Sequence, residues 1–173
     1  MLRYSLALVL TAGSLSACMP VSVVPGLVPS RAATEAIGCQ LPPDSAALKD
    51  GLLSAVNTRR RAAGLQPLRV SAALERAAAI VACDNAQRGQ MTHVTRQGAD
   101  LRARVRGQGY GYRMAAEALA HGYRSPEGLE AIWAGSSYHR PTLMTPSAQD
   151  AGISVVLSPG GSPWWAMISA RSR

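Results

Sequence analysis

Apolar side chains recur at helical spacing along two stretches in the first half of the chain. Positions three and four apart fall on one face of a helix, so each stretch predicts an amphipathic helix. The first covers residues 44–64, with Asp44 or Ser45 at its start and Gly64 at its end, and the second follows the capping residue Ser71 and ends near Gly89. The two apolar faces consist of Leu48, Leu52, Leu53 and Val56, and of Leu74, Ala77, Ala78, Val81 and Ala82.

A shorter helix is predicted over residues 98–107, where Leu101 and Val105 stand four positions apart. Three arginines lie within it, at Arg102, Arg104 and Arg106. This arrangement favours an amphipathic helix with a solvated arginine face. The alternative is that the basic run attracts an anionic lipid or a cell-wall polymer.

The last third of the chain changes to strand-like patterns. Residues 151–158 and 162–170 are rich in Val, Ile and Trp and flank the turn sequence PGGS, which predicts a β-hairpin. Ser125 followed by Pro126 begins a predicted helix over 125–136. The stretch 113–123 is compatible with a helix or a strand, because its alanines suit the first and its length the second. Helices followed by a closing hairpin indicate an α+β fold.

Composition and charge describe an ordinary globular chain with a basic surface. The 173 residues are 47% hydrophobic and 16% charged, which is consistent with a single domain. The formal net charge is +8, but the chain has no nucleic-acid-binding motif, so nucleic acid is not expected as a partner. Motifs for nucleotides, flavin and haem are missing as well, so an organic cofactor is not expected.

The N-terminus has the layout of a bacterial secretory signal. One arginine precedes a short apolar run and small residues over 1–17, and the run is too short for a stable membrane-spanning helix. Cys18 completes the sequence LSAC, which resembles the lipobox of bacterial lipoproteins, whose cysteine is acylated. We therefore expect export, a lipid anchor on Cys18 with the membrane as partner, and a tether over 18–36. By resemblance to proteobacterial lipoproteins, Met19 rather than Asp after the cysteine favours the outer membrane, with the domain in the periplasm or at the cell surface. The alternative is an ordinary signal cleaved after Ala17.

Acylation of Cys18 would leave two of the three cysteines, Cys39 and Cys83, in a compartment that permits disulfides. A bond between them would join the segment before the first helix to the second helix and close a loop of about 44 residues. The alternative is two independent buried thiols.

Several short motifs together resemble a known family. The first helix contains an N-x-x-R pattern at Asn57 and Arg60, and the further motifs are AGLQPLRVSAALERAA (63–78), MTH (91–93), GYGYRMAAEALAHG (109–122), WAGSSYHR (133–140) and the two C-terminal strands. In this order and spacing, the stretch from about 45 to 170 resembles the CAP superfamily of cysteine-rich secretory proteins, antigen 5 and pathogenesis-related proteins, in its short bacterial SCP form. The resemblance implies a CAP/SCP-like domain over 37–173, an α-β-α sandwich with a small antiparallel sheet between helices. It also implies that 113–123 is a strand.

The family carries a cleft with two histidines and two acidic residues, and the resemblance places most of that set in this chain. His93 matches the first histidine, Glu117 the first glutamate and His139 the second histidine. Ser136 stands where the second acid usually lies, three residues after the helix tryptophan, as in many bacterial members. Ala118 replaces an asparagine of the family, which puts one hydrogen bond of the cleft in doubt.

The resemblance implies binding of Zn²⁺ or another divalent cation, as in some members of the family, with His93 and His139 as ligands and Glu117 as a third donor. The alternative is that Glu117 is a buried structural acid that pairs with a histidine or with Arg140. The leading expectation is a ligand-binding or interaction module rather than an enzyme, with a lipid or an envelope component as its ligand. One alternative is a metal-dependent hydrolase of peptide or cell-wall substrates, which the missing second acid disfavours. A second alternative is a structural envelope lipoprotein. A serine hydrolase using Ser136 and His139 is disfavoured, because no G-x-S-x-G motif surrounds the serine.

Overall fold

A computed structural model describes residues 38–173 of the chain. The signal peptide predicted for 1–17, the lipidation site Cys18 and the tether over 18–36 lie outside the described residues and stay predictions. Within 38–173, none of the helices has both the length and the apolar character that crossing a membrane requires.

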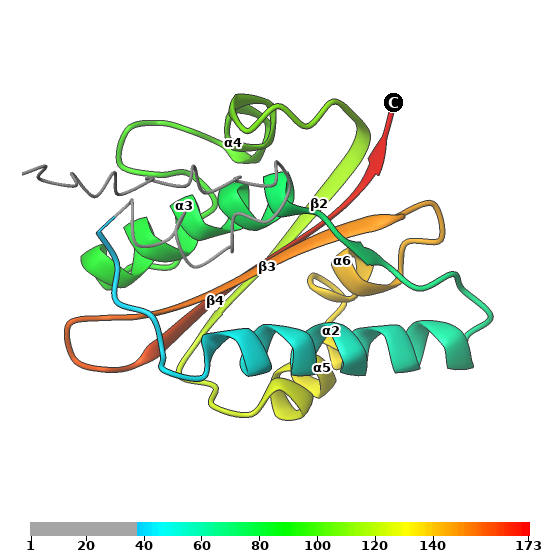
Figure 1. The fold of residues 1–173 in the computed structure, drawn as a ribbon, viewed down its shortest axis with the longest axis horizontal. Coiled ribbons are helices and arrows are strands. Elements are labelled where there is room, and N and C mark those ends of the chain that lie inside the picture. The colour runs from blue at the N-terminus through cyan, green and yellow to red at the C-terminus, as the bar shows by residue number, and fades with distance from the viewer. Residues whose placement is uncertain (1–37) are drawn as a thin grey trace, which may run out of the picture.

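A four-stranded sheet forms the middle of the domain, with the strand order β1-β3-β4-β2 (Figure 1). β3 (Asp150–Leu157) and β4 (Pro163–Ser172) form the predicted antiparallel hairpin, and β2 (Tyr112–His121) pairs antiparallel with the other side of β4. The short β1 (Arg69–Val70) runs parallel to β3. The sheet is therefore mixed rather than wholly antiparallel, because a long crossover separates β1 from β3 along the chain.

Helices cover both faces of the sheet (Figure 1). α2 (Ser45–Ala62), α5 (Pro126–Gly135) and α6 (Arg140–Met144) lie on one face, and α3 (Ala72–Arg88) and α4 (Leu101–Gly107) lie on the other. Each interface between helices and sheet has its own apolar core, one containing Leu52, Val56, Leu129 and Trp133, the other Leu74, Val81 and Val105. The α-β-α sandwich and the α+β class are confirmed.

The helix boundaries follow capping signals in the sequence. Ser71 Oγ accepts a hydrogen bond from the Leu74 N–H at the start of α3, and Ser125 Oγ accepts one from the Gly128 N–H at the start of α5. α3 ends at Gly89, whose φ of 62° is the left-handed conformation that favours glycine. The five-residue α6 was not predicted, because so short a helix has no full hydrophobic period.

The ambiguous stretch at 113–123 is a strand. Ala118 and Ala120 pack into the core beneath α2 and α5, whereas Leu119 packs into the core on the α3 side. Successive side chains of a strand point to opposite faces of a sheet, and here both faces are covered by helices. The strand implied by the family resemblance is therefore confirmed.

Cys39 and Cys83 form a disulfide with a Cα–Cα distance of 5.8 Å, and both residues are buried. The bond joins the segment before α2 to the second half of α3 across 44 positions of sequence. The predicted pairing is confirmed.

The N-x-x-R pair of α2 has a structural role. Asn57 Nδ2 donates a hydrogen bond to the Leu68 carbonyl over 3.0 Å, and Asn57 Oδ1 accepts one from the Leu68 N–H over 2.7 Å. Arg60 is fully buried, and its guanidinium donates to the carbonyls of Gln66, Leu143, Thr145 and Ala148. These bonds fix the loop before β1 and the loop after α6, whose buried carbonyls need donors.

Candidate functional site

His93 lies in the loop between α3 and α4, and its ring contacts the middle of β2. His93 Nδ1 lies 2.8 Å from Oε1 of Glu117. The Glu117 side chain is only 2% exposed, whereas that of His93 is 61% exposed. A carboxylate accepts hydrogen bonds, so His93 Nδ1 carries the proton and Nε2 is the ring nitrogen left for a ligand.

Arg104 of α4 forms a buried ion pair with Glu117. Arg104 Nη2 lies 2.9 Å from Oε1 and 2.7 Å from Oε2 of Glu117, and the Arg104 side chain is 1% exposed. The same guanidinium donates to the carbonyls of Ala77 and His93. Arg104 therefore neutralises the buried carboxylate and also positions the loop that carries His93.

The prediction of a solvated arginine face on α4 is wrong for Arg104, although Arg102 and Arg106 are exposed. Arg104 lies one helical turn after Leu101, beside the apolar face that Leu101 and Val105 form. In the sequence, this position of Arg104 was the sign that its side chain could be buried. It was not decisive, because an arginine rarely occupies a core position unless an acidic residue from another element is present to pair with it.

His139 is positioned locally by Ser136 at the end of α5. His139 Nδ1 lies 3.0 Å from Ser136 Oγ, and the same oxygen accepts the His139 N–H over 3.4 Å. The ring of His139 also lies near that of buried Trp133, with 6.3 Å between centroids. Ser136 thus forms a turn that orients the imidazole through Nδ1, and as in His93 the Nε2 atom is the nitrogen available to a ligand.

The two imidazoles have pKa values shifted in opposite directions. The hydrogen bond from His93 to Glu117 raises the pKa of His93, against the opposing effects of burial and of Arg104. Burial lowers the pKa of His139, and the nearby His93 lowers it further. At a pH near the ordinary histidine value, His93 is therefore the more protonated of the two.

The cleft does not fit a zinc centre with three protein ligands. Within residues 38–173, no group of three or more His, Cys, Asp and Glu side chains is arranged to hold a metal ion. Glu117, the expected third donor, is engaged by Arg104 and His93. Binding of Zn²⁺ by His93 and His139 alone stays a prediction.

An open groove of about 430 Å³ adjoins the cleft, and His139 lies in its wall. Three large apolar side chains of the lining are exposed: Met91 at 53%, Tyr123 at 37% and Ile132 at 52%. Met91 is two residues from His93, so one loop contributes to both the cleft and the groove. The rest of the wall consists of Leu119, Ala120, His121, Gly122 and Trp133. We call this feature the apolar groove.

A larger hollow of about 610 Å³ lies between α2 and α5. Small side chains and the ion pair between Arg59 and Glu130 form most of its described lining, and the large exposed apolar residues of the domain lie elsewhere. The apolar groove is therefore the better candidate for a ligand with an apolar part.

The mixed sheet between two helix layers, with His93 against Glu117 in the middle of β2 and His139 just after α5, defines an SCP-like domain. A family model for the cysteine-rich secretory protein family, CAP, matches residues 53–168, so the chain belongs to that family. This confirms the family that the sequence motifs indicated.

Relatives and solved structures agree with this assignment. The uncharacterized protein YkwD of Bacillus subtilis (strain 168) is 25% identical over 123 residues, which are 71% of this chain and 47% of that protein. The chain thus spans about half the length of this curated relative. An outer surface protein of Borrelia burgdorferi has the same fold, with a TM-score of 0.67, 17% identity, and coverage of 73% of this chain and 93% of that one. An extracellular SCP-domain protein of Bacillus anthracis str. Ames matches with a TM-score of 0.64 and 19% identity over 76% of this chain and 44% of that one.

Proposed function

We propose that this chain is an exported CAP-domain protein, anchored through Cys18, that binds an amphipathic ligand with an acidic head beside the imidazole cleft. The observation that carries the proposal is the apolar groove of about 430 Å³, with Met91, Tyr123 and Ile132 exposed in its wall. Its volume lies within the range of small-molecule sites, and a monomeric protein rarely exposes grouped apolar side chains without a partner for them. The surface and extracellular descriptions of the two structural relatives support export.

The groove and the cleft suit the two parts of such a ligand. An acyl chain along Met91, Tyr123 and Ile132 would remove apolar surface from water. Its head would then lie near His139, which belongs to both features. A carboxylate there accepts a charge-assisted hydrogen bond from protonated His93, which its raised pKa favours.

A metal-dependent hydrolase receives less support from the same residues. Ser136 replaces a carboxylate that could serve as a general base, and it forms a hydrogen bond with His139 instead. The remaining carboxylate, that of Glu117, is buried against Arg104. A binding function requires only the two imidazoles, which Glu117 and Ser136 already orient.

Binding of dibromostearate to the purified protein tests the proposal, because bromine quenches the fluorescence of Trp133 in the groove wall. The variant Ile132→Asp is expected to bind on the order of tenfold more weakly, since it places a charge where the acyl chain lies. The matched control is Val70→Asp. Val70 is apolar, is 58% exposed, and lies in β1, at the edge of the sheet opposite β2. This control should leave the affinity unchanged.

The head-group interaction is tested by comparing dibromostearate with its methyl ester. A double variant, His93→Ala with His139→Ala, should weaken binding of the acid and leave binding of the ester nearly unaltered. No quenching by either compound, or equal affinities in Ile132→Asp and the unsubstituted protein, would contradict the proposal and favour a structural envelope lipoprotein.

A further inference from the structure

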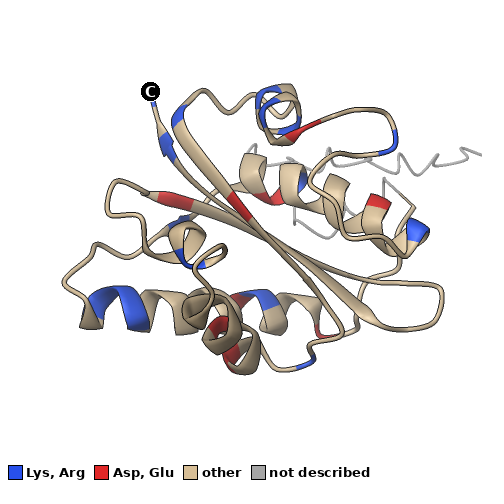
Figure 2. Cartoon of the chain, turned by 180° about the vertical axis from the view of Figure 1, so that it is seen from behind, with Lys and Arg blue, Asp and Glu red and all other residues tan. Residues whose placement is uncertain are grey.

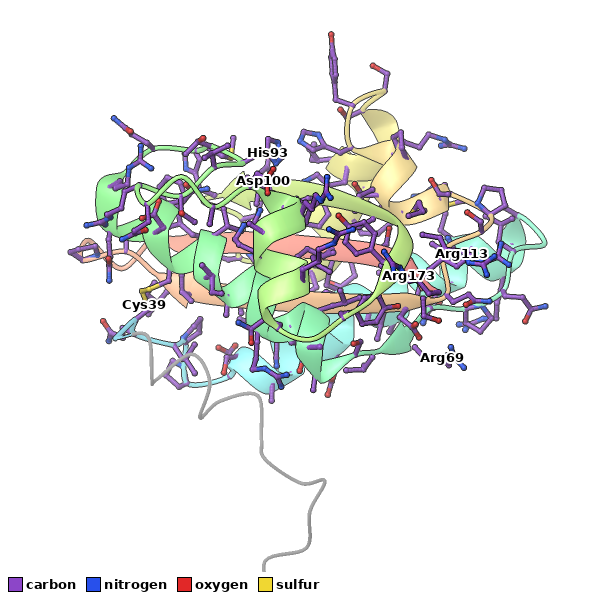
Figure 3. The ribbon with its side chains drawn as sticks, turned by 90° about the horizontal axis from the view of Figure 1, so that it is seen from above. Cys39, Arg69, His93, Asp100, Arg113 and Arg173 are labelled. Carbon is purple, nitrogen blue, oxygen red and sulfur yellow. A yellow bond between two sulfur atoms is a disulfide. The ribbon has the colours of Figure 1, made fainter. Side chains whose placement is uncertain are left out.

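Five exposed arginines lie at the end of the sheet where β2 begins and β4 ends, and we call this group the arginine end. Figure 3 shows three of them, Arg69, Arg113 and Arg173, on the same side of the molecule. All five side chains belong to exposed residues, and the full group is Arg69, Arg106, Arg113, Arg171 and Arg173.

The register of the sheet brings these residues together. Arg171 of β4 lies opposite Met114 of β2, and the register shift between Tyr112 and Met114 makes Arg113 an extra, bulged residue beside it. The Arg173 N–H donates a hydrogen bond to the Gly111 carbonyl over 3.2 Å, which holds the last residue against the start of β2.

Arg106 and Arg69 flank this centre. The guanidinium of Arg106 lies over the ring of Tyr112, 5.9 Å from its centroid, at the first residue of β2. Arg69 pairs across the sheet with Asp150, whose partner on β4 is Ala170, next to Arg171. The cluster therefore extends across the width of the sheet at this end, from β1 to β2.

Positive charge dominates the arginine end. Among the described residues, Asp150 is the acidic residue that pairs with a member of this group. It contacts Arg69 at 3.0 Å and accepts a hydrogen bond from the Tyr110 hydroxyl. Other acidic residues are paired elsewhere, such as Asp84 with Arg88 and Arg96. Figure 2 shows blue Lys and Arg segments close to the C-terminus. Arginines at neighbouring positions, which outnumber the acidic side chains around them, attract polyanions.

We propose that the arginine end binds an anionic polymer of the cell envelope through its phosphate or carboxylate groups. Its position argues for a polymer rather than the anchoring bilayer. The described chain starts beside Cys39, at the opposite side of the molecule from Arg113 and Arg173 (Figure 3). At that far end of β3, the Leu157 N–H bonds to the Gln40 carbonyl. The chain from an anchor at Cys18, on which this choice rests, would enter the domain there, on the side away from the arginine end.

The surface chemistry agrees with this choice. Among residues 38–173, Val70, beside Arg69, is the large exposed apolar residue at this end, and the others lie at or near the cleft and the groove. A surface that inserts into a bilayer usually combines basic residues with several apolar ones. Planar guanidinium groups form bidentate hydrogen bonds with carboxylate and phosphate groups, which a polyanion carries at regular intervals.

The test measures binding of labelled polyphosphate to the purified protein by fluorescence anisotropy at low salt, with neutral dextran as the uncharged probe. The double variant Arg113→Gln, Arg171→Gln is expected to raise the Kd about tenfold and to flatten its salt dependence. The matched control, Arg61→Gln with Arg124→Gln, removes the same charge from two exposed residues outside the cluster and should change the Kd less than twofold. Polygalacturonate, a polymer of carboxylates, should give the same ranking.

Several results would overturn the inference. These are equal weakening in both double variants, no binding to either polymer at low salt, or binding only to phosphatidylglycerol vesicles, which would assign the cluster to a membrane. If the Gln variant folds poorly, Arg173→Gln serves instead, because its residue follows the last strand. Ile132→Asp should bind polyphosphate normally, so failure of the groove proposal and failure of this one are distinguishable.

Discussion

At the residue scale, the candidate site depends on a buried ion pair between Arg104 and Glu117 that places His93. Both side chains are almost fully buried, so each charge relies on the other for compensation. Removing one partner leaves an uncompensated charge in the core, whereas removing both leaves a neutral pair of similar volume. The arrangement therefore makes a specific prediction for stability.

Arg104→Met should lower the free energy of unfolding by about 3 kcal/mol or more, measured by urea denaturation. Adding Glu117→Gln to it should recover part of that loss, because the orphaned carboxylate is gone. Arg102→Met on the same helix is the control, since Arg102 is exposed, and should cost less than about 0.5 kcal/mol. Equal losses for Arg102→Met and Arg104→Met would contradict the buried pair.

The His93 pKa gives a second prediction at this scale. A folded-state pKa raised above the unfolded value stabilises the fold fully below about pH 6.5, and that contribution disappears as the pH rises through the folded value. The stability difference between the protein and His93→Gln should therefore shrink from acidic to mildly alkaline pH. NMR titration of the ring protons should show His93 titrating above His139, whose pKa is lowered. Glu117→Gln should move the His93 pKa downward, and an unchanged value would refute the assigned cause.

At the scale of elements, the approach of α3 to β3 sets the position of the helix layer behind the cleft. A Cβ atom added to Gly152 of β3 would lie 2.1 Å from the Leu74 carbonyl carbon and 2.2 Å from the Glu75 nitrogen. Both contacts are with main-chain atoms, which cannot move aside as a flexible side chain can. Gly152 is therefore required for close packing between the start of α3 and the sheet.

Gly152→Ala should destabilise the protein by about 3 kcal/mol or more, or prevent folding, because backbone of α3 would have to shift. The control is Gly107→Ala at the end of α4, where an added Cβ meets nothing within 4 Å. Thermal denaturation should place the control near the unsubstituted protein and Gly152→Ala well below it. Similar melting temperatures for the two variants would show that α3 is not held in this way.

At the scale of the whole molecule, the disulfide ties the point where the described chain begins to the α3 layer. The bond between Cys39 and Cys83 closes a 44-position loop that contains α2 and β1. It therefore fixes the segment that leads into α2 against α3, in the core on the α3 side of the sheet. Cross-linking a long loop stabilises the fold chiefly by restricting the unfolded chain.

The variant Cys39→Ser with Cys83→Ser should lose about 3 to 4 kcal/mol of unfolding free energy. Denaturation of the unsubstituted protein with and without reducing agent should show the same difference, while the double variant should be insensitive to the reductant. A reductant effect that persists in the double variant would assign it to another group.

Much of the fold followed from the sequence because its signals are local. Ser71 and Ser125 mark helix starts through hydrogen bonds to residues three positions away, and the paired Val- and Ile-rich runs around PGGS specify a hairpin. The order of the motifs identified the family and placed His93, Glu117 and His139. Those motifs also settled the strand at 113–123, which periodicity left open.

The tertiary structure alone decided the burial of Arg104, the engagement of Glu117 and the presence of the apolar groove. Each of these depends on residues far apart in the sequence: Arg104 meets Glu117 from another element, and Met91, Ile132 and His139 come from three different segments. The arginine end arises in the same way, from the register of β2 against β4. Local pattern determines which residues form helices and strands, but the environment of a charged side chain is fixed only when those elements pack together.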